Sequence, residues 1–115
     1  MTIDQTLAEM IEISTHTSRV ALFDTDGCLL AESGVGSSDT TAVANLWAAA
    51  DEAAHLLGRP PVTQCEIGLR DAFVFAVREQ GRSAIAVTDR DATAGLVFYD
   101  LRAALRANGD DDARK

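Results

Sequence analysis

Residues 62–107 read VTQCEIGLRDAFVFAVREQGRSAIAVTDRDATAGLVFYDLRAALRA, and this stretch decides the fold of the chain. Three β-rich runs, at 62–69, 72–77 and 83–88, follow one another with only short turns between them. Turns of this length join antiparallel neighbours, so the three runs predict a three-stranded meander. The rest of the stretch predicts an amphipathic helix over 91–107, capped by Asp89 or Asp91 and ended by Asn108-Gly109. Its expected inward-facing residues are Ala94, Val97, Phe98, Leu101 and Leu105.

The first half of the chain supplies a helix, a hairpin and a second helix. Residues 4–14 carry apolar side chains at helical spacing. Two β-rich runs, 19–23 and 28–32, flank Asp24-Thr25-Asp26-Gly27, and Asp-Gly between apolar runs is typical of a hairpin turn. The second helix is expected over 40–57, with Gly58 and Pro60-Pro61 ending it. Its predicted core-facing stripe is Val43, Leu46, Trp47, Ala50, Ala54 and Leu57.

These elements give the order α-β-β-α-β-β-β-α, which is an α/β (α+β) single-domain sandwich with a five-stranded antiparallel sheet. We predict the strand order 2-1-5-4-3, which places the final strand beside the first and leaves the third strand at an exposed edge. Thr63, Gln64, Cys65 and Glu66 do little to blunt that edge, so pairing with a second copy is expected. The domain is predicted over 1–109, followed by a disordered acidic tail over 110–115.

Composition excludes several classes of protein. The chain has 115 residues and a net charge of −8, which argues against binding to nucleic acid or to an anionic membrane surface. No apolar run approaches the length of a membrane span, and the start of the chain lacks the pattern of a signal peptide. Cys28 and Cys65 are isolated from each other in sequence, which favours two reduced, buried thiols. We therefore expect a soluble cytoplasmic domain with no membrane insertion.

Catalytic signatures are absent from the sequence. There is no G-x-x-x-x-G-K-[ST] motif, and Gly34-Val35-Gly36 lacks the third glycine of a dinucleotide site. His16 and His55 have no neighbour at metal-ligand spacing. Trp47 lies in the helical stripe, which favours a core position over a binding platform. The sequence therefore predicts no enzyme, no cofactor and no metal site.

Three segments carry a family resemblance: the hairpin Val20–Ala31, the edge run Val62–Leu69 and, most of all, Ser83–Leu105. In these the chain resembles the Roadblock / dynein light chain family, and more closely the Roadblock proteins of actinobacterial conservon operons, which are encoded beside small Ras-like GTPases. The resemblance covers nearly the whole chain. It departs from the family at Thr15-His16-Thr17-Ser18, where Pro-Gly is frequent, and at Arg90, where proline is frequent.

The resemblance implies a Roadblock/longin/profilin-like sandwich that acts as a non-catalytic homodimer and a signalling partner of a small Ras-like GTPase. In such dimers the edge strands pair and the central helices lie side by side. By this resemblance the dimer contact would include Val62, Thr63, Gln64, Cys65, Glu66, Ala49 and Ala53. On the solvent side of the second helix, the residues Asn45, Asp51, Glu52 and His55 are candidates for contact with the GTPase or with the second copy.

Two other functions fit the same elements. One is a small-molecule sensor of PAS or profilin-like fold, with a ligand cavity beside the small residues Ala84, Ala86 and Ala94. The other is a structural partner of a sensor histidine kinase.

Overall fold

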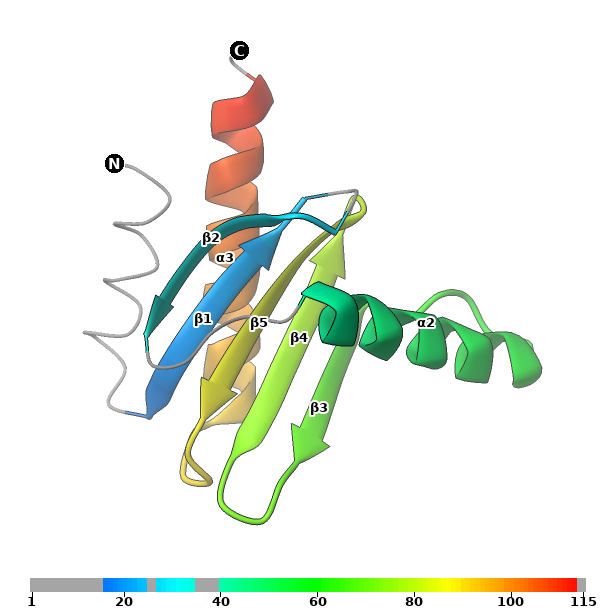
Figure 1. Ribbon diagram of the computed structural model, residues 1–115, viewed down its shortest axis with the longest axis horizontal. Coiled ribbons are helices and arrows are strands. Elements are labelled where there is room, and N and C mark those ends of the chain that lie inside the picture. The colour runs from blue at the N-terminus through cyan, green and yellow to red at the C-terminus, as the bar shows by residue number, and fades with distance from the viewer. Residues whose placement is uncertain (1–15, 25–26, 35–39, 114–115) are drawn as a thin grey trace.

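The computed structural model describes residues 16–24, 27–34 and 40–113, with side chains described up to Ala107. The helix predicted at 4–14 and the segment 35–39 lie outside these residues. The described elements are β1 (Thr17–Phe23), β2 (Leu29–Gly34), α2 (Thr40–Leu56), β3 (Gln64–Gly68), β4 (Phe73–Glu79), β5 (Arg82–Thr88) and α3 (Ala94–Ala113), arranged as in Figure 1.

The five strands form one antiparallel sheet in the order β2-β1-β5-β4-β3, which confirms the predicted topology. The two-residue turn between β4 and β5 explains the close meander. Gln80 and Gly81 both have positive φ, 53° and 82°, and this pair of conformations matches the right-handed twist of the flanking strands. The final strand therefore returns beside β4 and then pairs with β1 on its other side.

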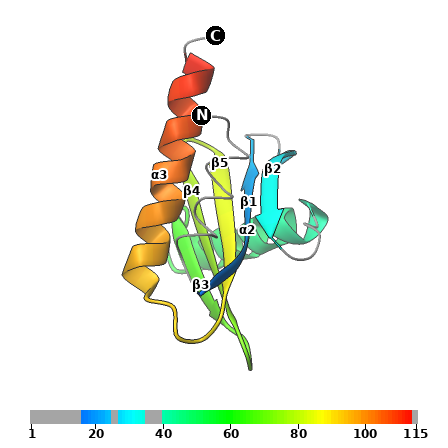
Figure 2. The same cartoon turned by 90° about the vertical axis from the view of Figure 1, so that its left-hand side faces the viewer.

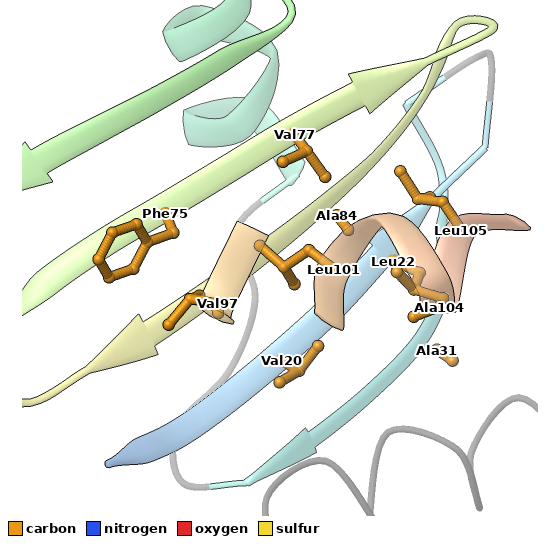
Figure 3. Packing of buried hydrophobic residues seen from close by; sticks show 11 residues of the cluster. Val20, Leu22, Ala31, Phe75, Val77, Ala84, Val97, Leu101, Ala104 and Leu105 are labelled. Atoms are coloured by element: carbon orange, nitrogen blue, oxygen red, sulfur yellow. The ribbon is translucent and has the colours of Figure 1, made fainter. Parts of the chain in front are cut away.

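The sheet separates two layers of unequal tightness. Figure 2 shows α3 along one face and α2 on the other. The α3 face holds the hydrophobic core, where Phe75 and Val77 of β4 pack with Leu101 of α3. Figure 3 shows this cluster, in which the predicted inward residues Val97, Leu101 and Leu105 are buried and Ala104 joins them. Alternation along each strand produces this face, since successive side chains point to opposite sides of the sheet.

The second helix lies across one end of the sheet and extends past β3 (Figure 1). Trp47 and Ala54 are buried, as predicted, but Leu57 is 76% exposed, so its predicted core position is wrong. The physical reason is the helix end. Gly58, with φ 66°, donates to the carbonyl of His55, and Arg59 donates to Ala54, which is a Schellman motif. This turn takes Leu57 out of the helix and away from the sheet.

Three further sequence predictions are wrong in detail. The last helix continues to Ala113, past its predicted end at Asn108-Gly109. It starts at Ala94, where the carbonyl of Thr93 accepts the first helical bonds, from Leu96 and Val97. Asp89 instead closes the preceding turn, because its carboxylate accepts from the amide of Asp91. Cys28 is exposed and Cys65 is only half-buried, because both lie away from the α3 core.

Candidate interaction surface

The outer edge of β3 presents backbone groups that point away from the sheet. Within the described residues, β3 pairs with β4 alone. Arg78 donates its backbone N–H to the carbonyl of Thr63, so Thr63 faces β4. The direction of the backbone N–H and C=O groups alternates along a strand. The backbone groups of Cys65 and Ile67 therefore also point toward β4, whereas those of Gln64 and Glu66 point outward. The edge is open over these residues.

The side chains of β3 divide between the two faces of the sheet. Gln64 accepts a hydrogen bond from Arg102 of α3, so it belongs to the α3 face. Cys65 is opposite Ala76 in the ladder and lies on the α2 face. Burial raises the pKa of the Cys65 thiol, which keeps the sulfur protonated and weakly nucleophilic at neutral pH. Val62 and Thr63, expected in the strand, lie just before it.

The outward side of α2 is a row of exposed side chains. Five residues are exposed, as the sequence predicted for three of the four partner-contact candidates and for the small flank: Asn45, Glu52, His55, Ala49 and Ala53. The helix also ends on two exposed leucines, Leu56 and Leu57, at 78% and 76% exposure. An apolar helix end beside an open strand edge is typical of a surface that another protein covers.

Asp51 differs from its neighbours on α2. Its carboxylate receives two hydrogen bonds from the guanidinium of Arg78, at 3.1 Å and 2.5 Å, and a third from the amide of Val62 at 3.3 Å. The hydrogen bonds from Arg78 are the main reason that the pKa of Asp51 lies below its ordinary value. The carboxylate is therefore engaged inside the protomer.

Arg78 is the centre of this cluster. It donates from Nη2 to the carbonyl of Val62 at 2.7 Å, and its guanidinium lies 4.5 Å from the ring centroid of Trp47. Only 20% of its side chain is exposed. Sequence reasoning did not single out Arg78. The signal available was its position: a charged residue that follows the apolar run of β4 and faces α2 by strand alternation.

A pocket of about 230 Å³ opens beside the same cluster, between the start of α2 and the ends of β1 and β4. It is lined by Asp24, Gly27, Val43, Ala44, Trp47, Arg78, Gly81 and Ser83. The indole nitrogen of Trp47 is buried here without a hydrogen-bond partner in the described structure. This pocket is on the opposite face from Ala84 and Ala86, which are completely buried in the α3 core. The cavity expected beside those two alanines is therefore occupied by packed side chains.

The described residues also bear on metals and membranes. Nowhere in the described ranges do three or more histidine, cysteine or acidic side chains gather as metal ligands do. No helix in the described part of the chain is long and apolar enough to cross a membrane.

The geometry defines a class of protein: a five-stranded antiparallel sheet of order 2-1-5-4-3, with a tightly packed last helix on one face and a loosely held central helix on the other. Similarity to solved structures identifies this fold. The chain has the Roadblock/LC7 fold. Over 90% of its length it is similar to a Roadblock/LC7 domain from Streptomyces avermitilis, with 92% of that chain covered, a TM-score of 0.77 and 18% identity.

Two structures of MglB are also similar to this chain. Myxococcus xanthus MglB matches 89% of this chain and 87% of its own, with a TM-score of 0.71 and 20% identity. MglB in a tetrameric arrangement matches 91% of this chain and 83% of its own, with a TM-score of 0.75 and 20% identity. No protein-family model and no curated protein matches the sequence. At these identities the likeness establishes the fold.

Proposed function

We propose that this chain is a non-catalytic, homodimeric regulator or scaffold that binds a small Ras-like GTPase in the cytoplasm. The observation that carries the proposal is the Roadblock/LC7 fold, shared with MglB over nine-tenths of the chain. The partner class comes from the sequence resemblance to Roadblock proteins that are encoded beside such GTPases. An interaction module also agrees with a chain whose sequence carries no catalytic signature.

The proposed dimer contact combines β3 and α2. The outward backbone groups of Gln64 and Glu66 would pair with the same groups of a second copy, extending the sheet across a dyad. Ala49 and Ala53 are small and exposed, so they let another helix approach α2 closely. Burial of Leu56 and Leu57 against the second copy would remove apolar surface from water, at about 25 cal/mol per Å². The MglB structure in a tetrameric arrangement supports self-association as a property of this fold.

The proposed GTPase contact is the polar part of the exposed row of α2, namely Asn45, Glu52 and His55, whereas Ala49 and Ala53 of that row belong to the proposed dimer contact. Asp51 is assigned a different role below, because Arg78 already engages its carboxylate. A regulator needs only a difference in affinity between the two nucleotide states of the GTPase. A scaffold binds both states equally.

The test is capture of partners from native extract on tagged protein, with added GDP or a non-hydrolysable GTP analogue, read by mass spectrometry. Recovery of a Ras-like GTPase in one nucleotide state supports a regulator, and recovery in both supports a scaffold. The double variant Asn45→Arg/Glu52→Arg is expected to abolish capture. Ala103→Arg, at an exposed position of α3, is the matched control and should leave capture unchanged.

Failure to capture a GTPase in either state would refute this partner class. A sensor histidine kinase in the captured material would then identify the alternative partner. A melting temperature raised by a small molecule would favour the sensor, since a ligand that binds the folded state stabilises it by mass action.

A further inference from the structure

Within the described residues, the Asp51–Arg78 ion pair connects α2 to the sheet through side-chain hydrogen bonds. Contacts between α2 and the strands are sparse, in contrast to the continuous packing of α3 on β4 and β5. On α2, Trp47 and Ala54 are the buried side chains, and the intervening turn carries Asp51. A helix held this lightly depends on few interactions for its orientation.

This ion pair joins α2 to β4, which carries Arg78, and to the segment just before the edge strand β3. The Asp51 carboxylate accepts from the amide of Val62, and the Arg78 guanidinium donates to the carbonyl of the same residue. The backbone of Arg78 also donates to Thr63 at 2.8 Å. The side chains of Asp51 and Arg78 therefore hold both the N–H and the C=O of Val62, two residues before β3 begins at Gln64. The position of α2 and the start of the open edge are set together.

Conservative substitutions cannot reproduce the Asp51–Arg78 ion pair, because both side chains form directional hydrogen bonds. The guanidinium fork reaches both carboxylate oxygens and Val62 while its face lies over the Trp47 ring. A lysine ammonium retains the charge but not the fork or the planar stacking. An asparagine at position 51 retains the shape of aspartate but not the second acceptor or the charge.

We infer that Asp51 and Arg78 are positioning residues for self-association: they hold α2 and the start of β3 in the relative arrangement that the dimer contact requires. The inference rests on the proposed homodimer. It assigns Asp51 to an ion pair within the protomer, with 41% of its side chain still exposed, and leaves Asn45, Glu52 and His55 for partner contact. Neither Asp51 nor Arg78 needs to touch the second copy for the effect to arise.

The test compares Asp51→Asn and Arg78→Lys with the control Glu32→Gln. Glu32 forms an ion pair with buried Arg19 between β1 and β2, at the opposite side of the sheet from β3. The dissociation constant of the dimer is measured by sedimentation, and the melting temperature is measured on the same samples. Asp51→Asn and Arg78→Lys are expected to weaken the dimer about tenfold or more, the effect of losing one charge-assisted hydrogen bond. Glu32→Gln is expected to leave dimer affinity within about twofold even where it lowers the melting temperature as much.

The single tryptophan of the chain supplies a direct readout of the ion pair, since Trp47 lies against Arg78. Its emission is expected to change in Asp51→Asn and Arg78→Lys and to stay unchanged in Glu32→Gln. Equal dimer affinity in the wild type and in the Asp51 and Arg78 variants would overturn the inference about positioning and leave the proposed dimer standing. Equal weakening in all three variants would also overturn it, because a general loss of stability would then be the cause. A wild-type chain that stays monomeric would refute the proposed dimer, and the inference with it.

Discussion

Gly34 closes β2 in a backbone conformation that L side chains rarely adopt. Its φ is 107°, and a Cβ atom built there would lie 2.1 Å from the carbonyl oxygen of Ser18 on β1. The sequence shows this residue only as the start of a glycine-rich loop. The structure shows why no other residue fits: the end of β2 passes directly over the backbone of β1.

Gly34→Ala is therefore expected to destabilise the chain by about 1–3 kcal/mol from backbone conformation alone, with the steric clash adding to it. Gly95→Ala is the matched control, because a Cβ at this helical position meets nothing within 4 Å. That control is expected to be neutral or to stabilise by up to about 1 kcal/mol. Denaturant unfolding of both variants measures the difference, and equal stability would contradict the assignment.

A second residue-scale feature links the start of β1 to the loop before α3. His16 and Asp89 form an ion pair at 3.0 Å, and Asp89 also donates its backbone N–H to the carbonyl of His16. The hydrogen bond with Asp89 raises the pKa of His16 above 6.5, and the same bond lowers the pKa of Asp89 below 3.8. The contribution of His16 is complete below its unfolded pKa and is lost as the pH rises through its folded value. The contribution of Asp89 is present above its unfolded pKa and is lost as the pH falls through its folded value.

The pair therefore stabilises the folded chain most at mildly acidic pH, above the unfolded-state pKa of Asp89 and below the unfolded-state pKa of His16. Asp89→Asn is expected to lower the pKa of His16 toward its ordinary value, as measured by NMR titration of the imidazole. Asp91→Asn removes only a weaker, longer-range attraction and should lower the pKa of His16 less. An equal shift in the two variants would show that the direct hydrogen bond is not the cause. Because both side chains are largely exposed, added salt should reduce the effect.

At the scale of elements, β3 allows its inner and outer hydrogen bonds to be tested separately. The N–H of Glu66 points away from β4, whereas the N–H of Ile67 points toward it. Glu66→Pro removes an outward donor and is expected to abolish the proposed dimer while the protomer stays folded, since edge strands accept proline where the N–H faces outward.

Ile67→Pro removes a bond within the sheet and is expected to lower the melting temperature strongly. Sedimentation and thermal unfolding of the two variants distinguish the outcomes. A Glu66→Pro variant that remains dimeric would place the contact elsewhere.

The helices show how far local patterns predict their own ends. Gly58 ends α2 as predicted, because its positive φ and its Schellman bonds are local properties. Asn108-Gly109 carries the same kind of signal, yet α3 continues through it. A local hydrogen bond takes Asp89 away from the cap of α3: its carboxylate closes its own turn, and the helix begins after Thr93. Similar motifs at two helix ends therefore gave different outcomes.

At the scale of the whole molecule, the proposed complex needs no arginine supplied to the nucleotide. Arg70 lies exposed beside Asp71 in the turn between β3 and β4, and we expect it to be an ordinary turn residue. We expect Arg70→Ala to leave the GTP hydrolysis of a captured GTPase within about threefold of normal, whereas loss of an arginine finger costs about 10³-fold or more. Single-turnover hydrolysis with and without the variant measures this. A loss on the arginine-finger scale would reassign Arg70 to catalysis.

The sequence by itself determined the order of the described elements, the sheet order 2-1-5-4-3 and the open edge at β3. Short turns and the apolar periodicities of strands and helices are local features, so they can be recognised in the amino-acid sequence. The tertiary structure alone decided which α2 side chains form ion pairs within the protomer. Periodicity places Asp51 on a solvent-facing side of the helix, yet Arg78, 27 positions later, binds its carboxylate while 41% of the Asp51 side chain stays exposed. The tertiary structure also placed the buried indole of Trp47 beside a pocket on the α2 face rather than in the α3 core. Contacts between residues far apart in sequence depend on how the layers pack, and no local pattern encodes them.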